Sequence, residues 1–145
     1  MRYSQYKFNF YLNASHAIYI DGKLGAAHPH TWEIIIRTIK SQKEFVMFNE
    51  VENRIEQFLG TYQNRYINEF EPFDAMNPTL ENITSYFLEQ LEELLEPLGW
   101  IVFYIEVSET PTRSYVISRV ENNIISDLQQ KNMVEDIIDS AFQEE

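Results

Sequence analysis

The three histidines of the chain are the residues whose placement suggests chemistry. His28 and His30 are separated by one residue, so on a β-strand both imidazoles point to the same face. His16 ends an earlier alternating segment, on its apolar face. If the two segments pair as antiparallel strands, the loop 17–27 brings all three imidazoles together. Three imidazoles with an open fourth position are typical of a catalytic zinc site.

Two points limit this interpretation. Imidazole nitrogen also suits copper and nickel, so the ligand type alone does not select zinc. The other interpretation is that each histidine is an ordinary core or surface residue with one hydrogen bond. The clustering of all three histidines within one short stretch favours a shared site.

The elements that must position these side chains follow from periodicity. Residues 3–16 and 28–40 alternate with period two, which predicts half-buried strands. Apolar residues then recur at helical spacing over 51–62 and 80–98, which predicts two helices. Two more strands follow, at 100–109 and 113–118. In the first of them, one face is expected to carry Ile101, Phe103, Ile105, Val107 and Glu109.

This order predicts an α+β fold with two layers, in which a four-stranded antiparallel sheet carries two helices on one face. We expect one domain over residues 1–118 and an acidic helical extension over residues 119–145, with short apolar stripes at helical spacing. The edge strands of such a sheet are a liability unless another subunit pairs with them, which favours an oligomer.

Composition excludes several classes of protein. Hydrophobic residues make up 44% of the 145 residues, which is enough for a core and excludes disorder as the main state. The net charge of −12 argues against a basic nucleic-acid-binding face. The absence of cysteine excludes disulfides and a cysteine nucleophile. No apolar run is long enough to span a membrane, so we expect a cytoplasmic protein.

Several short motifs then resemble one family. The chain resembles 6-pyruvoyl-tetrahydropterin synthase and 6-carboxy-tetrahydropterin synthase (QueD), which have the T-fold. Five pieces carry the resemblance in the correct order, and they are similar to the family's F-x-A-A-H, H-G-H, L-N, P-T-x-E-N and E-T. They are, in turn, residues 12–16, His28-Pro29-His30, Ile67-Asn68, residues 78–82 and Glu109-Thr110.

The resemblance implies a site and an assembly. It implies a zinc ion bound by His16, His28 and His30, and a pterin ring anchored by Glu109, with Thr110 and Thr79 in the same pocket. A carboxylate suits this ring because it accepts two parallel hydrogen bonds from a guanidine-like edge. It also implies a homo-oligomer, typically a hexamer, in which subunits pair their sheets. From the residues alone, Glu109 is also explained as an edge charge and Thr79 as a helix cap.

The chain departs from the family where protons are transferred. Leu24 stands at the position of the family's cysteine, and Gln63 and Asn64 stand at its Asp-His pair. None of these three side chains relays a proton as a general base must. Pro29 also replaces the glycine of H-G-H, which predicts a strand edge or a bulge there.

Three functions therefore remain open. The first is a zinc protein that binds a pterin or a related purine-like ligand without the usual synthase activity. The second is an active zinc-dependent lyase or synthase in which a substitute base such as Asp21 acts, because burial can raise the pKa of a carboxyl. The third is a non-catalytic oligomer that binds a partner through its acidic tail. Hydrolysis by zinc-bound water lacks a recognisable helper motif.

Overall fold

A computed structural model describes residues 4–40 and 45–119. It contains a long antiparallel pair, β1 (Tyr6–His16) and β4 (His28–Lys40), joined by a small hairpin of β2 (Tyr19–Ile20) and β3 (Lys23–Leu24). Two helices follow, α1 (Phe48–Gly60) and α2 (Leu80–Leu95), with the short strand β5 (Arg65–Tyr66) between them. The strands β6 (Trp100–Thr110) and β7 (Arg113–Ser118) complete the fold. The predicted tail helices of residues 120–145 lie outside the described residues.

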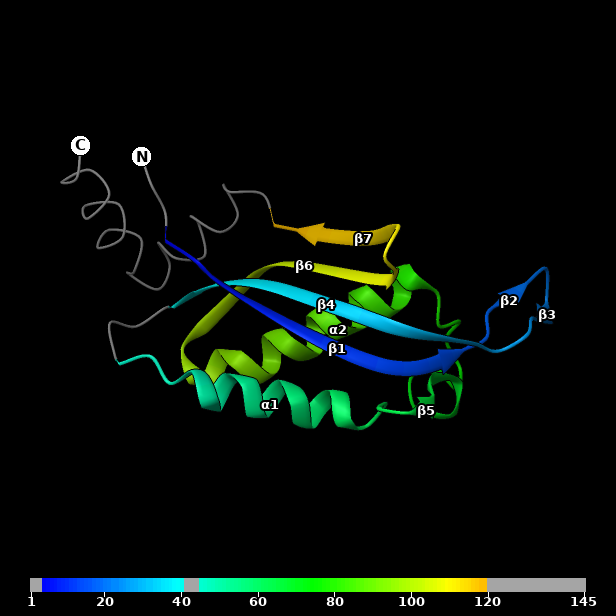
Figure 1. Cartoon of the computed structure of the whole chain (residues 1–145), viewed down its shortest axis with the longest axis horizontal. Coiled ribbons are helices and arrows are strands. Elements are labelled where there is room, and N and C mark those ends of the chain that lie inside the picture. Colours follow the sequence, from blue (N-terminus) through cyan, green and yellow to red (C-terminus); the bar gives the residue numbers. More distant parts are fainter. Residues whose placement is uncertain (1–3, 41–44, 120–145) are drawn as a thin grey trace.

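The main sheet has the strand order β5-β1-β4-β6-β7, and both helices lie on one side of it (Figure 1). The predicted two-layer α+β architecture is therefore confirmed. The sheet has five strands rather than the predicted four, because Arg65 and Tyr66 pair in parallel with Ala14 and Ser15. Two residues are too few for alternation to reveal a strand in the sequence.

The period-two pattern of β1 and β4 is the reason for their burial. Phe8, Phe10, Leu12 and Ala14 of β1 are buried and alternate with exposed residues, and the same holds for Trp32, Ile34 and Ile36 of β4. These side chains meet the apolar stripes of the helices, which include Val51, Ile55 and Leu59 of α1 and Ile83, Phe87 and Leu91 of α2. The helices thus cover the same sheet face on which His16 lies.

The strand β6 contains a bulge that corrects one prediction. Arg37 of β4 pairs with Tyr104 and Thr38 pairs with Val102, so Phe103 has no partner on β4. One extra residue reverses the alternation, because side chains on a strand point to opposite faces in turn. Trp100 and Val102 are therefore buried before the bulge, and Ile105 and Val107 after it. The prediction that Ile101 and Phe103 share the face of Ile105 was wrong for this reason.

Candidate metal centre

The antiparallel register of β1 and β4 positions the histidines. His16 lies directly opposite His28, and Ala14 lies opposite His30, so the three residues occupy adjoining places at one end of the strand pair. His16 is buried, His30 is partly buried and His28 is exposed. The ring centroid of His30 is 5.1 Å from that of His16 and 6.4 Å from that of His28.

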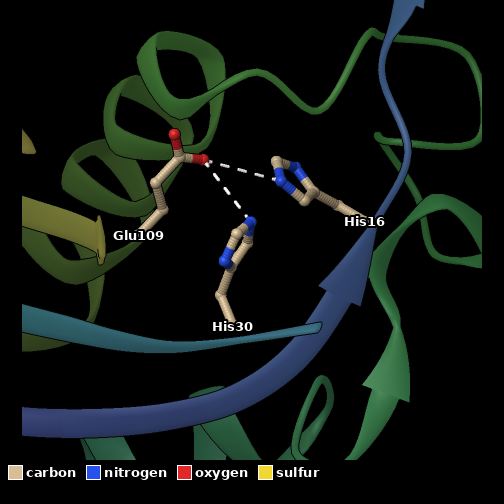
Figure 2. Close-up of side chains that lie close together, drawn as sticks. All are labelled: His16, His30 and Glu109. Atoms are coloured by element: carbon tan, nitrogen blue, oxygen red, sulfur yellow. Dashed lines mark ion pairs between the residues drawn. The ribbon is translucent and has the colours of Figure 1, made fainter. Parts of the chain in front are cut away.

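A carboxylate from a distant part of the chain joins two of these imidazoles. Glu109, near the end of β6, places its Oε2 atom 3.5 Å from Nε2 of His16 and 3.9 Å from Nε2 of His30 (Figure 2). Possible ligand atoms of the three residues all lie within 4.8 Å of one another. The structure thus brings His16, His30 and Glu109 into one cluster, and His28 lies at its exposed margin.

The hydrogen bonding of His16 determines which of its nitrogens faces the cluster. Nδ1 of His16 lies 2.7 Å from the carbonyl oxygen of Pro78. A carbonyl oxygen only accepts hydrogen bonds, so Nδ1 carries the ring proton and its N–H donates a hydrogen bond to the Pro78 carbonyl. In the neutral ring, Nε2 then presents a lone pair toward Glu109. A histidine that donates its other N–H to a backbone carbonyl is the usual arrangement of a metal ligand.

The lowered pKa of His30 also favours a neutral ring that can bind a metal ion. Burial lowers the pKa of His30 below its ordinary value of 6.5, and the nearby His16 imidazole lowers it further, while the Glu109 carboxylate opposes both effects. A neutral His30 at neutral pH leaves its ring able to coordinate a cation. Two imidazoles and one carboxylate form a donor set that zinc accepts, so these residues fit the metal that the sequence suggested.

The indole of Trp32 packs against the imidazoles of both His16 and His30. Its ring centroid lies 4.8 Å from that of His16 and 5.4 Å from that of His30, both edge to face. Its indole N–H donates to the carbonyl of Ala14 at 3.0 Å. The buried indole is therefore fixed in place, and it restricts how the two histidine rings can turn.

Arg113 holds the other oxygen of Glu109. Its Nε atom donates to Oε1 at 2.8 Å across the turn between β6 and β7. The Glu109 side chain is 12% exposed, so it is not an edge charge that simply reaches solvent. Sequence reasoning missed Arg113, although a basic residue four positions after Glu109, across a hairpin turn, was an available signal.

Three amide side chains clamp the backbone around His16. Gln63 accepts from the N–H of Asn13 at 2.8 Å and donates to the carbonyl of Tyr11 at 3.0 Å. Asn68 accepts from the N–H of Ala17 at 2.9 Å and donates to its carbonyl at 2.7 Å. These bonds hold the chain on both sides of His16.

Asn77 makes the third clamp, on the N–H and carbonyl of Tyr19 at 2.9 and 3.0 Å. It precedes Pro78, whose carbonyl accepts from His16, so one loop holds both the hairpin and the imidazole. In the sequence, Asn68 was recognised only as part of a family motif, and no structural role was predicted for Asn77. A side-chain amide can match the backbone in this way because its NH₂ group donates while its carbonyl oxygen accepts.

The side chains of the other predicted site residues form no hydrogen bond to His16, His30 or Glu109 within the described residues. Thr79 is the N-cap of α2, and its hydroxyl accepts from the N–H of Asn82 at 3.2 Å. The hydroxyl of Thr110 contacts that of Thr112 at 3.1 Å. Asp21 and the exposed Leu24 belong to the β2–β3 hairpin, which extends beyond the end of β1 and β4 (Figure 1). Asp21 is in the turn, where its φ is 53°.

Comparison with known proteins places this geometry in context. The family model of 6-pyruvoyl tetrahydropterin synthase matches residues 5–120. A search of curated proteins found no match. No helix among the described residues combines the length and apolar character needed to cross a membrane.

Several solved structures share the fold. The 6-pyruvoyl tetrahydropterin synthase of Caenorhabditis elegans has a TM-score of 0.67 at 15% identity, covering 82% of this chain and 97% of that chain. An uncharacterized protein from Wolinella succinogenes has a TM-score of 0.63 at 16% identity, covering 82% and 99%. A Plasmodium vivax synthase, in a mutant whose catalytic glutamate is replaced by alanine, has a TM-score of 0.57 at 16% identity, covering 82% and 99%.

Proposed function

Because the chain belongs to the 6-pyruvoyl tetrahydropterin synthase family, we propose that it is a zinc protein that binds a pterin or a related purine-like ligand, without the usual synthase activity. The observation that carries this proposal is the convergence of His16, His30 and Glu109 from three separate strands. Homologues of this family process pterins as oligomers, and the proposal extends their ligand class to this chain.

In this proposal, His16, His28 and His30 hold the zinc ion. His28 belongs to the set because it shares a face of β4 with His30 and lies opposite His16 in the strand register. The competing third ligand is Glu109, whose carboxylate lies near His16 and His30. When bound, zinc supplies a Lewis acid that polarises an oxygen atom of the ligand.

Glu109 is proposed to recognise the ligand ring. Its two oxygens can accept parallel hydrogen bonds from the guanidine-like edge of a pterin or purine. The Arg113 guanidinium keeps the carboxylate oriented through Oε1. Thr79 and Thr110 are proposed to line the same site, as the resemblance implies.

The loss of proton-transfer groups supports a binding role. Leu24, Gln63 and Asn64 stand at the positions of the family's cysteine, aspartate and histidine. Both ends of the Gln63 amide are already bound to the β1 backbone. Neither an amide nor an aliphatic side chain can take up a proton as a general base.

The alternative is an active zinc-dependent pterin lyase or synthase that uses a substitute base such as Asp21. One observation favours it: the Plasmodium vivax relative has a catalytic glutamate, so a carboxylate serves catalysis in a protein of this fold. In this chain Asp21 is exposed in the hairpin turn. Turnover of dihydroneopterin triphosphate that disappears in Asp21→Asn would establish this alternative.

A homo-oligomer, in the family a hexamer, is part of the proposal. β7 is an edge of the sheet within the described residues, and Tyr115 and Val116 of this strand are exposed. An unpaired edge is a ready template for pairing with another subunit. A further alternative, a partner-binding oligomer that acts through its acidic tail, depends on residues 119–145, of which 120–145 lie outside the described residues.

Metal analysis and a pterin titration of the purified full-length chain test the proposal. We expect bound zinc, saturable quenching of pterin fluorescence, and no turnover of dihydroneopterin triphosphate. His16→Ala is expected to lose the zinc. Glu109→Gln is expected to keep zinc and lose pterin, whereas Glu52→Gln on the exposed face of α1 retains both. Loss of zinc in Glu109→Gln but not in His28→Ala would make the carboxylate the third ligand, and protein without zinc would refute the proposal.

A further inference from the structure

A concave site borders His30 and opens on the face of the sheet opposite the helices. A pocket of about 390 Å³ is lined by Asn13, Ala14, Ser15, Pro29, His30, Thr31, Asn64 and Arg65. Asn13, Ser15, Pro29 and Thr31 of this lining alternate along β1 and β4 with Leu12, Ala14, His30 and Trp32, whose side chains lie on the face that the helices cover. Because neighbouring residues on a strand face opposite ways, these four side chains point away from the cluster of His16, His30 and Glu109, although His30 itself also borders the pocket.

The pocket wall is rich in hydrogen-bond donors. The hydroxyl of Thr31 donates to Oδ1 of Asn13 at 2.8 Å, so the amide nitrogen is the end of Asn13 that remains available. Neither the hydroxyl of Ser15 nor the side-chain amide of Asn64 bonds to another residue within 4–40 or 45–119. The backbone N–H of Asn64 donates to the carbonyl of Asn13, which holds Asn64 at the wall in the left-handed conformation, with φ of 60°.

Charge sets this pocket apart from the rest of the molecule. The chain has 23 acidic residues against 11 basic ones, yet no acidic side chain lines the pocket. The Arg65 guanidinium lies 5.8 Å from the ring centroid of Phe70 and forms no ion pair with an acid in the described part of the chain. An unpaired guanidinium beside neutral donors is suited to an oxyanion, since its planar N–H groups match carboxylate and phosphate oxygens.

We propose that this pocket binds a small oxyanion, the phosphate or carboxylate group of a small molecule, through Arg65, Asn13, Asn64 and Ser15. Arg65 supplies the charge and a two-pronged donor, and the two amides and the hydroxyl supply single hydrogen bonds. The site goes beyond the proposed zinc and pterin function, because none of these four residues belongs to the cluster of His16, His30 and Glu109.

Titration of the full-length chain with inorganic phosphate, pyrophosphate and succinate tests this site. The titrations are done at constant ionic strength, with calorimetry and with NMR of the side-chain amides. We expect saturable binding that shifts the amide signals of Asn13 and Asn64. Arg65→Gln is expected to weaken binding about tenfold or more, because it removes a charge-assisted bidentate contact. Arg65→Lys keeps the charge and should give an intermediate affinity.

Arg54→Gln is the matched control, since it removes the same charge from an exposed position of α1. Binding of phosphates without succinate would assign the site to phosphate groups, and the reverse would assign it to carboxylates. Absence of saturation with all three anions would overturn the proposal, as would equal weakening by Arg54→Gln and Arg65→Gln. Binding that survives in Arg65→Gln but vanishes when a chelator removes bound metal would place the anion at the histidine cluster and also overturn it.

Discussion

At the scale of single residues, Gln63 illustrates how an amide can replace a titratable group and serve the fold. Its amide oxygen and nitrogen both bond to the edge of β1, next to the point where β5 pairs with the same strand. The position belongs to the proton-transfer pair in the family that the motifs resemble. A carboxylate there has no N–H for the carbonyl of Tyr11.

Gln63→Glu is therefore expected to lower the free energy of unfolding by about 0.5–1.5 kcal/mol at neutral pH, because the hydrogen bond to the Tyr11 carbonyl is lost. Urea unfolding measures the effect. Gln57→Glu, on the exposed face of α1, makes the same chemical change away from the sheet and should stay within about 0.5 kcal/mol. Equal losses in the two variants would show that the Gln63 clamp contributes nothing specific.

Asn68 acts on the candidate metal centre through the backbone next to His16. Its amide bonds to both polar groups of Ala17. Asn68→Asp removes the donor to the Ala17 carbonyl, so we expect the imidazole of His16 to be less well placed and zinc affinity to fall about tenfold. Competition with a zinc-chelating dye measures this affinity. Asn53→Asp on α1 is the control, and an unchanged affinity in Asn68→Asp would contradict the positioning role.

At the scale of elements, the bulge in β6 determines what the helices and the histidines contact. With Phe103 unpaired, the later half of the strand places Ile105 and Val107 on the core face. Glu109 continues that alternation and lies on the same side as His16 and His30, at the end of the sheet. A single strand therefore contributes both to the core and to the candidate metal centre.

Two alanine variants test this bulge. Ile105 is fully buried, so Ile105→Ala is expected to cost about 2–5 kcal/mol of stability. Phe103 is only partly buried, so Phe103→Ala should cost less despite the larger side chain. Urea unfolding of both variants gives the comparison. A greater loss for Phe103→Ala would show that the alternation runs unbroken through the strand.

At the scale of the whole molecule, an aromatic cluster joins the helices to the loop that follows α1. Tyr62 packs edge to face against Phe58, Phe70 and Phe73. Burial raises the pKa of Tyr62 well above its ordinary value of 10.0, and the nearby Tyr86 raises it further. The folded protein thus keeps a proton that the unfolded chain releases above pH 10.

Because the unfolded state then binds fewer protons, stability is expected to fall as pH rises through and above 10. Tyr62→Phe removes this group, so the loss of stability between about pH 9 and about pH 11 should be smaller than in the parent chain. Urea unfolding at both pH values measures the difference. An identical pH dependence in the two proteins would show that Tyr62 does not contribute.

The local pattern of the sequence determined the two long strands, the two helices and the placing of His28 and His30 on one face, because alternation and helical spacing are properties of neighbouring residues. The motifs also identified the family. Only the tertiary structure showed that Glu109 reaches His16 and His30, that Arg113 holds it, and that Gln63, Asn68 and Asn77 clamp the segment around His16. These contacts join residues far apart in the chain, and the bulge at Phe103 changes the face of every later side chain on its strand. Neither leaves a mark on local periodicity, since both depend on how completed strands and loops pack against one another.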